Sequence, residues 1–267
     1  MIDDIAAIAK CDGNSVVLNG IVSGKIQTKK IEFNDKKSVN MHIGPNSQKC
    51  QKLKVHETIM QNVENQLYLG DIISNSGTNC EDIKNRIKKG YSAISQIKSL
   101  VKSVGFGRFE IMTGLLMRDT IFVAKMLLNS EVWYSLTKSQ IEQLEIIDRN
   151  LIRQILGAHA KTGIEWLYLE TGKFDLKSLI QIRRLMYLWH ILSRDKSELI
   201  RRVYETQKLS NSTGDWYRLI ESDKKELEIQ MEDEEIQGVS QEKFKTYIKA
   251  KVKIKHLKIP QSVIHDR

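Results

Sequence analysis

The spacing of apolar residues changes near residue 80, and this change constrains the fold more than any other feature of the sequence. Before it, apolar residues alternate with polar ones over short segments, which is typical of half-buried strands. After it, they recur every three or four residues, as on one face of a helix. Only two prolines, Pro45 and Pro260, lie in the 267 residues, so long helices can form between them. We predict an α+β fold that is mostly α, with its strands before residue 76.

The part before residue 76 mixes strand and helix signals. Val39, Met41 and Ile43 alternate with polar residues, which is the period of a half-buried strand. Gly20 and Gly24 weaken a helical pattern, because glycine costs about 1 kcal/mol relative to alanine in a helix. The predicted elements are a strand over 5–9, a weak helix over 16–29, a strand over 38–43, and short strands over 53–55 and 67–73 that pair as a hairpin.

Four helices are predicted from residue 79 onward. Asn79 is a suitable N-cap for the first of them. Its apolar positions are Ile83, Ile87, Tyr91, Ile94, Ile97 and Val101. The second covers 109–128 and the fourth covers 176–192. The third begins at Thr137, where Gln140 completes a capping box, and Gly157 ends it.

Two aromatic residues on the fourth predicted helix, Tyr187 and Trp189, allow two interpretations. Their rings could stack on bases. Aromatic residues at helical spacing more often belong to a hydrophobic core, and that is what we expect here.

The positive charge of the chain favours a polyanionic partner. Its formal net charge is +9 and its isoelectric point is about 9.3, and nucleic acid is the natural partner of such a surface. Lys84, Lys88 and Lys89 on the first predicted helix are candidate phosphate contacts, because neutralising phosphates releases counterions. The alternative is a solvated basic surface without a ligand.

Charges separate into two blocks near the end of the sequence. Residues 221–235 hold eight acids against Lys224 and Lys225, and residues 241–267 hold seven lysines and one arginine against Glu242 and Asp266. The blocks either pair with each other or mark a basic tail.

Several classes of protein do not fit the sequence. Cys11, Cys50 and Cys80 lack the spacing of a zinc site or a disulfide framework. No apolar run approaches the roughly 18 residues of a membrane span, and no signal peptide opens the chain. We expect an intracellular protein, cytoplasmic or nuclear, without a membrane partner.

Two adjacent carboxylates, Asp3 and Asp4, lie between apolar residues at the start of the sequence. Carboxylate oxygens are hard ligands that suit Mg²⁺, and paired metal ions can activate an attacking oxygen and stabilise a leaving one. The alternative is that both are solvated acids at a frayed terminus.

Several segments together resemble the reverse transcriptases of non-LTR (LINE-type) retrotransposons. Met1-Ile2-Asp3-Asp4 resembles the aromatic-x-Asp-Asp motif, and 30–44, with Asn34-Asp35-Lys36-Lys37-Ser38, resembles the Asn-x-x-Lys-Ser/Thr segment. Tyr68-Leu69-Gly70 resembles the hairpin likened to a primer grip. Residues 131–134 and 143–156 resemble the thumb and its helical continuation. The motifs occur in the family's order over most of the chain.

The resemblance implies a partial palm over 1–76, a helical thumb-like region over 77–160, and a helical C-terminal region with a basic tail over 161–267. It implies an RNA-directed DNA polymerase that uses an RNA template, a DNA primer, nucleotides and Mg²⁺. Asp3 and Asp4 would be the catalytic metal ligands, and Tyr68, Leu69 and Gly70 the primer-grip hairpin.

The sequence departs from the family at Met1, where the family carries an aromatic residue. The fingers, the first catalytic aspartate and the template-contacting motif, which precede that point in the family, are absent from these 267 residues. We therefore expect a fragment of a polymerase that is inactive alone. The alternative is a non-catalytic, basic, helical nucleic-acid-binding protein derived from a decayed element.

Overall fold

The computed structural model describes residue 8 and residues 38–44, 54–55, 58–102, 108–134, 136–210 and 215–257. The chain divides into two compact units, 1–82 and 83–267. Among the described residues, short strands occur only in the first unit and helices make up the second. The described chain is mostly helical with a few short strands, as the change in apolar spacing predicts. The expected boundary at residue 160 stays a prediction.

The described strands of the first unit pair two by two. β1 (Val39–Asn40) and β4 (Gln61–Asn62) are parallel, β2 (Lys54–Val55) and β3 (Thr58–Ile59) are antiparallel, and so are β5 (Asn65–Tyr68) and β6 (Asp71–Ser74). The Asn40 side-chain amide donates to the side-chain oxygen of Asn62 at 2.9 Å, which reinforces the parallel pair. The Asp82 carboxylate accepts the Ile72 N–H at 3.1 Å, which anchors β6.

The β5–β6 hairpin reverses through a two-residue loop. Tyr68 pairs with Asp71, which leaves Leu69 and Gly70 at the turn with φ of 47° and 91°. Positive φ at both positions is the geometry of a type I′ turn, whose twist matches that of the flanking strands. The single strand predicted over 67–73 is therefore wrong, because the chain reverses inside it, and β2 pairs with β3 instead.

The other predictions for the first unit have mixed outcomes. The strand over 38–43 is present only as β1, and Ile43 beyond it is exposed rather than half-buried. The helix over 16–29 lies outside the described residues. So does the strand over 5–9, apart from Ile8, which is not in a strand.

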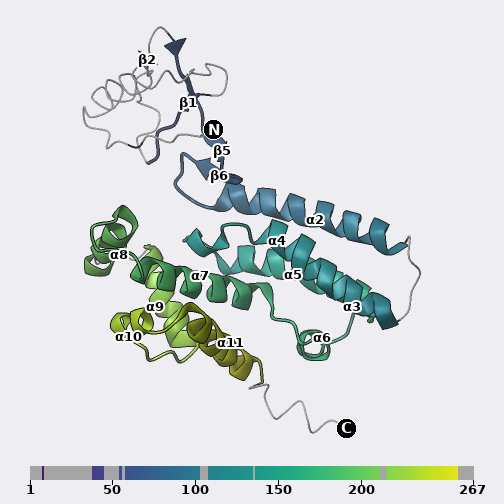
Figure 1. Cartoon of the computed structure of the whole chain (residues 1–267). Coiled ribbons are helices and arrows are strands. Elements are labelled where there is room, and N and C mark those ends of the chain that lie inside the picture. Colours follow the sequence, from purple (N-terminus) through teal and green to yellow (C-terminus); the bar gives the residue numbers. More distant parts are fainter. Residues whose placement is uncertain are drawn as a thin grey trace. The chain divides into compact units, whose positions relative to one another are not determined.

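The second unit is built from helices (Figure 1). They are α2 (Cys80–Lys102), whose first three residues belong to the first unit, α3 (Arg108–Met117), the π-helical turn η2 (Arg118–Phe122), α4 (Val123–Met126), the 3₁₀ turn η3 (Ser130–Val132), α5 (Lys138–Leu156), α6 (Ile164–Thr171), α7 (Leu176–Leu192), α8 (Leu199–Leu209), α9 (Trp216–Glu226), α10 (Asp233–Gly238) and α11 (Gln241–Leu257).

The four predicted helices are confirmed, with one difference. The predicted helix over 109–128 contains a π-helical turn, and a bulge of this kind is frequent near functional or specialised positions. The capping box of α5 is present: Thr137 and Gln140 exchange hydrogen bonds between side chain and backbone, and Gly157 ends the helix in the left-handed conformation. No strand lies between 82 and 156 among the described residues.

Helix α7 contributes side chains to both main hydrophobic clusters of this unit. Its place among the helices is seen in Figure 1. Leu176 and Ile180 pack with buried residues of α2, α4 and α5. Leu185, Leu188 and Leu192 pack with α9 and α11. One helix therefore holds most of the others in place, including the C-terminal helices that the apolar pattern did not predict.

Candidate nucleic-acid interface

A line of exposed side chains runs along α2. Lys84, Lys88, Tyr91 and Lys98 are exposed, and their spacing of four, three and seven residues keeps them on one side of the helix. Lys84 and Lys98 are separated by roughly 21 Å at the helical rise of 1.5 Å per residue. We call these four residues the α2 row. The two acids of this helix, Glu81 and Asp82, both precede Lys84, and no acid follows them along the row.

The other side of α2 is fixed in the core. Ile83, Ile94 and Ile97 are buried in the cluster that α2 shares with α4 and α5, so the row is held on the outer side. Tyr91 belongs to the predicted apolar period of this helix, but its side chain is 60% exposed. Tyr91 lies at the edge of the stripe, one turn from both Ile87 and Ile94.

The three predicted phosphate contacts do not share one face. Lys84 and Lys88 are exposed, but Lys89 is half-buried, because adjacent helical residues point about 100° apart. Lys98, which is not one of these three, is exposed on the same side as Lys84 and Lys88. Lys125 of α4 donates to the side-chain oxygen of Gln96 at 2.6 Å, which places a further positive charge beside α2.

The tip of the β5–β6 hairpin exposes a leucine in an unfavourable backbone conformation. Leu69 is 64% exposed and has a φ of 47°, which costs about 1–2 kcal/mol for a residue with a side chain. Tyr68 and Gly70 beside it are half-buried. Strained backbone of this kind tends to occur where a loop contacts a ligand, although a primer-grip role stays a prediction.

The predicted metal ligands, Asp3 and Asp4, lie outside the described residues. Within the part of the chain that the structure describes, no group of three histidine, cysteine, aspartate or glutamate side chains could hold a metal ion.

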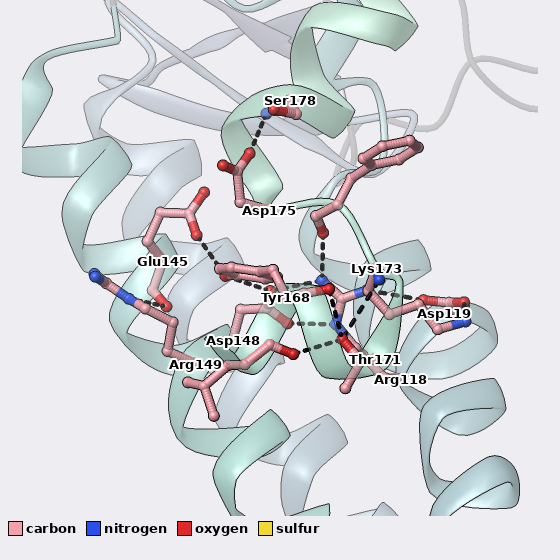
Figure 2. A network of polar contacts seen from close by, with 12 residues as sticks. Arg118, Asp119, Glu145, Asp148, Arg149, Tyr168, Thr171, Lys173, Asp175 and Ser178 are labelled. Atoms are coloured by element: carbon pink, nitrogen blue, oxygen red, sulfur yellow. Dashed lines mark hydrogen bonds and ion pairs between the residues drawn. The ribbon is translucent and has the colours of Figure 1, made fainter. Parts of the chain in front are cut away.

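A buried ion pair links the π-helical turn to α5 (Figure 2). The Nε and Nη2 atoms of Arg118 donate to the two carboxylate oxygens of Asp148 at 2.7 and 2.6 Å. Arg118 also donates to the Phe174 carbonyl oxygen at 2.9 Å, just before α7. Burial alone lowers the pKa of Arg118, but the hydrogen bonds and charge of Asp148 outweigh it and leave this pKa above its ordinary value, so the guanidinium is charged.

Tyr168 of α6 lies between two carboxylates of α5 (Figure 2). Its hydroxyl is 3.0 Å from Oε2 of Glu145 and 3.2 Å from Oδ2 of Asp148, and it can donate to one of them at a time. The other oxygen of Glu145 accepts the Lys177 N–H at 2.7 Å. Burial, with the charges of Asp175 and Asp148, raises the pKa of Glu145 to about 7.

This network stabilises the packing of the π-helical turn, α5, α6 and the start of α7 against one another. At its edge, Asp119 pairs with both Arg118 and Lys173, so the link reaches from the π-helical turn to the loop before α7. Sequence analysis did not identify it. The available signal was the pair Glu145 and Asp148, which are three residues apart and each follow an apolar residue directly.

Two further sequence predictions have clear outcomes. Tyr187 and Trp189 pack against the second hydrophobic cluster, and the Trp189 indole donates to the Val239 carbonyl at 2.8 Å, so the expectation that they belong to the core is confirmed. The charge blocks do pair in part, because Glu226 binds Lys255 at 2.6 Å. Residues 241–257 of the expected basic tail form α11.

Comparison of the chain with protein-family models, curated proteins and solved structures gives no match. No described helix is long and apolar enough to cross a membrane.

Proposed function

We propose that this chain binds nucleic acid without sequence preference through the α2 row. The observation that carries the proposal is a line of three exposed lysines and one exposed aromatic ring on a helix whose other side is held in the core. Lysines neutralise phosphates, and an exposed tyrosine offers a face on which a base can stack.

The wider setting that we propose is the reverse transcriptase of a non-LTR retrotransposon. In that setting the partners are an RNA template and a DNA primer, and the Leu69 tip of the hairpin contacts the primer. Asp3 and Asp4 would be the Mg²⁺ ligands of the intact enzyme. The alternative, a non-catalytic protein derived from such an element, uses the same α2 row.

The test is the salt dependence of binding to a fluorescently labelled RNA–DNA hybrid, measured by anisotropy on the full chain. Each phosphate contact should contribute about −0.7 to −0.9 to the slope of log affinity against log salt. The variant Lys84→Gln/Lys88→Gln/Lys98→Gln should flatten the slope by about 2 to 3. The matched control, Lys138→Gln/Lys161→Gln/Lys196→Gln, removes the same charge from exposed lysines on three separate segments.

Equal loss in both triple variants would mean that net charge, not the α2 row, causes binding, and would overturn the proposal. So would undetectable binding of the wild type at low salt. Tyr91→Ala should weaken binding to a single strand more than binding to a blunt duplex. The reason is that base faces are open to stacking on the tyrosine ring in a single strand, whereas in a duplex neighbouring base pairs cover them.

A further inference from the structure

We infer that the exposed lysines of α11 form a second phosphate-binding surface, suited to the backbone of a nucleic-acid duplex. Lys245, Lys249 and Lys253 are all exposed and are spaced four residues apart, so they follow one side of the helix over about 12 Å. We call these three residues the α11 row. The proposal goes beyond the α2 row, which can fail or succeed independently of it.

The orientation of α11 is fixed by its apolar side. Phe244, Ile248 and Val252 are fully buried in the cluster shared with α7. The α11 row is therefore held at the surface by a packed helix rather than by a loose tail.

Two other lysines of α11 are engaged, and the α11 row is not. Lys251 donates to the Glu228 carbonyl at 2.8 Å, and Lys255 pairs with Glu226 at 2.6 Å. Glu226 also binds Lys177 at 2.5 Å. Within the described part of the chain, Lys245, Lys249 and Lys253 have no such partner, so the neighbouring acids do not neutralise them.

The α11 row repels itself. Like charges four residues apart on a helix destabilise it, and the row contains two such pairs. Glu242 is the one acid of the helix. Binding of a polyanion would relieve this repulsion between lysines. The polyanion would release its counterions as the lysines neutralise its phosphates.

The chemistry of the surface favours a duplex backbone over the other polyanions. A helix that lies in a membrane surface needs a broad exposed apolar face. The apolar face of α11 is buried in the core, and Ile254 is the one large apolar side chain exposed on its described part. Among the described side chains of α11 no aromatic ring is exposed, in contrast to Tyr91 in the α2 row. Base stacking therefore contributes little, and phosphate contact dominates.

The first experiment compares full-length wild type with Lys245→Gln/Lys249→Gln/Lys253→Gln on a blunt RNA–DNA duplex. Three lost contacts should flatten the salt slope by about 2.7, which corresponds to about 40-fold less loss of affinity over a fourfold rise in salt. The arginine triple variant at the same positions should bind as wild type does. The control Lys138→Gln/Lys161→Gln/Lys196→Gln should keep the wild-type slope.

The second experiment needs no substitution. Acetylation of surface lysines, read by mass spectrometry, should be slowed by duplex at Lys245, Lys249 and Lys253 and unchanged at Lys138, Lys161 and Lys196. Protection of the α2 row alone would overturn this inference and leave the proposed function intact, and protection of the α11 row alone would do the reverse. Binding of phosphatidylserine vesicles, but not duplex, through the α11 row would also overturn it.

Discussion

The guanidinium of Arg118 and the carboxylate of Asp148 meet through two parallel hydrogen bonds in the interior of the helical unit. The side chain of Arg118 is 1% exposed and that of Asp148 is fully buried. Such a pair contributes geometric specificity, because a planar guanidinium matches a carboxylate in one orientation. It fixes the π-helical turn against α5 and, through the Phe174 carbonyl, against the start of α7.

Removing one partner of this pair should be costly. Arg118→Met leaves the Asp148 charge buried without its counterion, and the free energy of unfolding should fall by about 3–5 kcal/mol. The measurement is urea unfolding followed by circular dichroism. Arg118→Met/Asp148→Leu should recover much of this loss, because no unpaired charge remains. Glu198→Gln, which breaks the exposed pair with Arg194, should cost at most about 1 kcal/mol.

Glu145 should make stability depend on pH in the direction opposite to an ordinary salt bridge. Its pKa is raised from 4.5 to about 7 in the folded chain, so the folded state holds this proton more tightly than the unfolded state. The contribution of this proton to the free energy of unfolding is fully present below pH 4.5 and is lost as the pH rises to about 7.

The variant Glu145→Gln stays neutral over that range and can still accept the Lys177 N–H. The stability of the variant relative to wild type should therefore rise by up to about 3 kcal/mol between the two ends of the window. Urea unfolding at a series of pH values measures it. Parallel curves for wild type and variant would show that Glu145 is not responsible.

The sequence predicted correctly those structural features that depend only on neighbouring residues. The Thr137–Gln140 capping box and the Gly157 end of α5 need only neighbouring residues, and both are present. The apolar pattern missed the turn at Leu69, because leucine is not typical at positive φ, and only the resemblance placed a hairpin there. The burial of Glu145 and Asp148 was missed because it depends on Arg118 and Tyr168, which are distant in sequence. No periodicity reports such partners.

The close approach of α2 to α4 at Gly90 yields a further prediction. A Cβ at Gly90 would lie 2.3 Å from the sulfur of Met126, a buried side chain. Alanine usually gains about 1 kcal/mol over glycine in a helix, but overpacking costs about 1–3 kcal/mol. Gly90→Ala should therefore destabilise the chain in thermal or urea unfolding.

Two variants separate overpacking from helix propensity. In a Met126→Ala background, Gly90→Ala should become stabilising, because the clash is gone and the two changes are coupled. Gly238→Ala, where nothing lies within 4 Å of the added Cβ, should be neutral or slightly stabilising. Destabilisation of similar size at both glycines would contradict the role assigned to Met126.

The hairpin tip offers a test in which stability and binding move in opposite directions. Leu69→Asn replaces a leucine at φ of 47° with a residue that tolerates this conformation. The hairpin amides should exchange more slowly with deuterium, by the equivalent of about 1 kcal/mol. Binding to a primer–template hybrid should weaken, because the exposed apolar tip is lost.

Leu67→Thr is the matched control, because Leu67 is also exposed but lies in regular strand β5. It removes apolar surface without relieving strain, and threonine suits a strand. It should therefore leave both exchange and binding close to wild type. If Leu69→Asn slows exchange and leaves binding unchanged, the strain at Leu69 serves no contact with nucleic acid, and the primer-grip role of the tip is refuted.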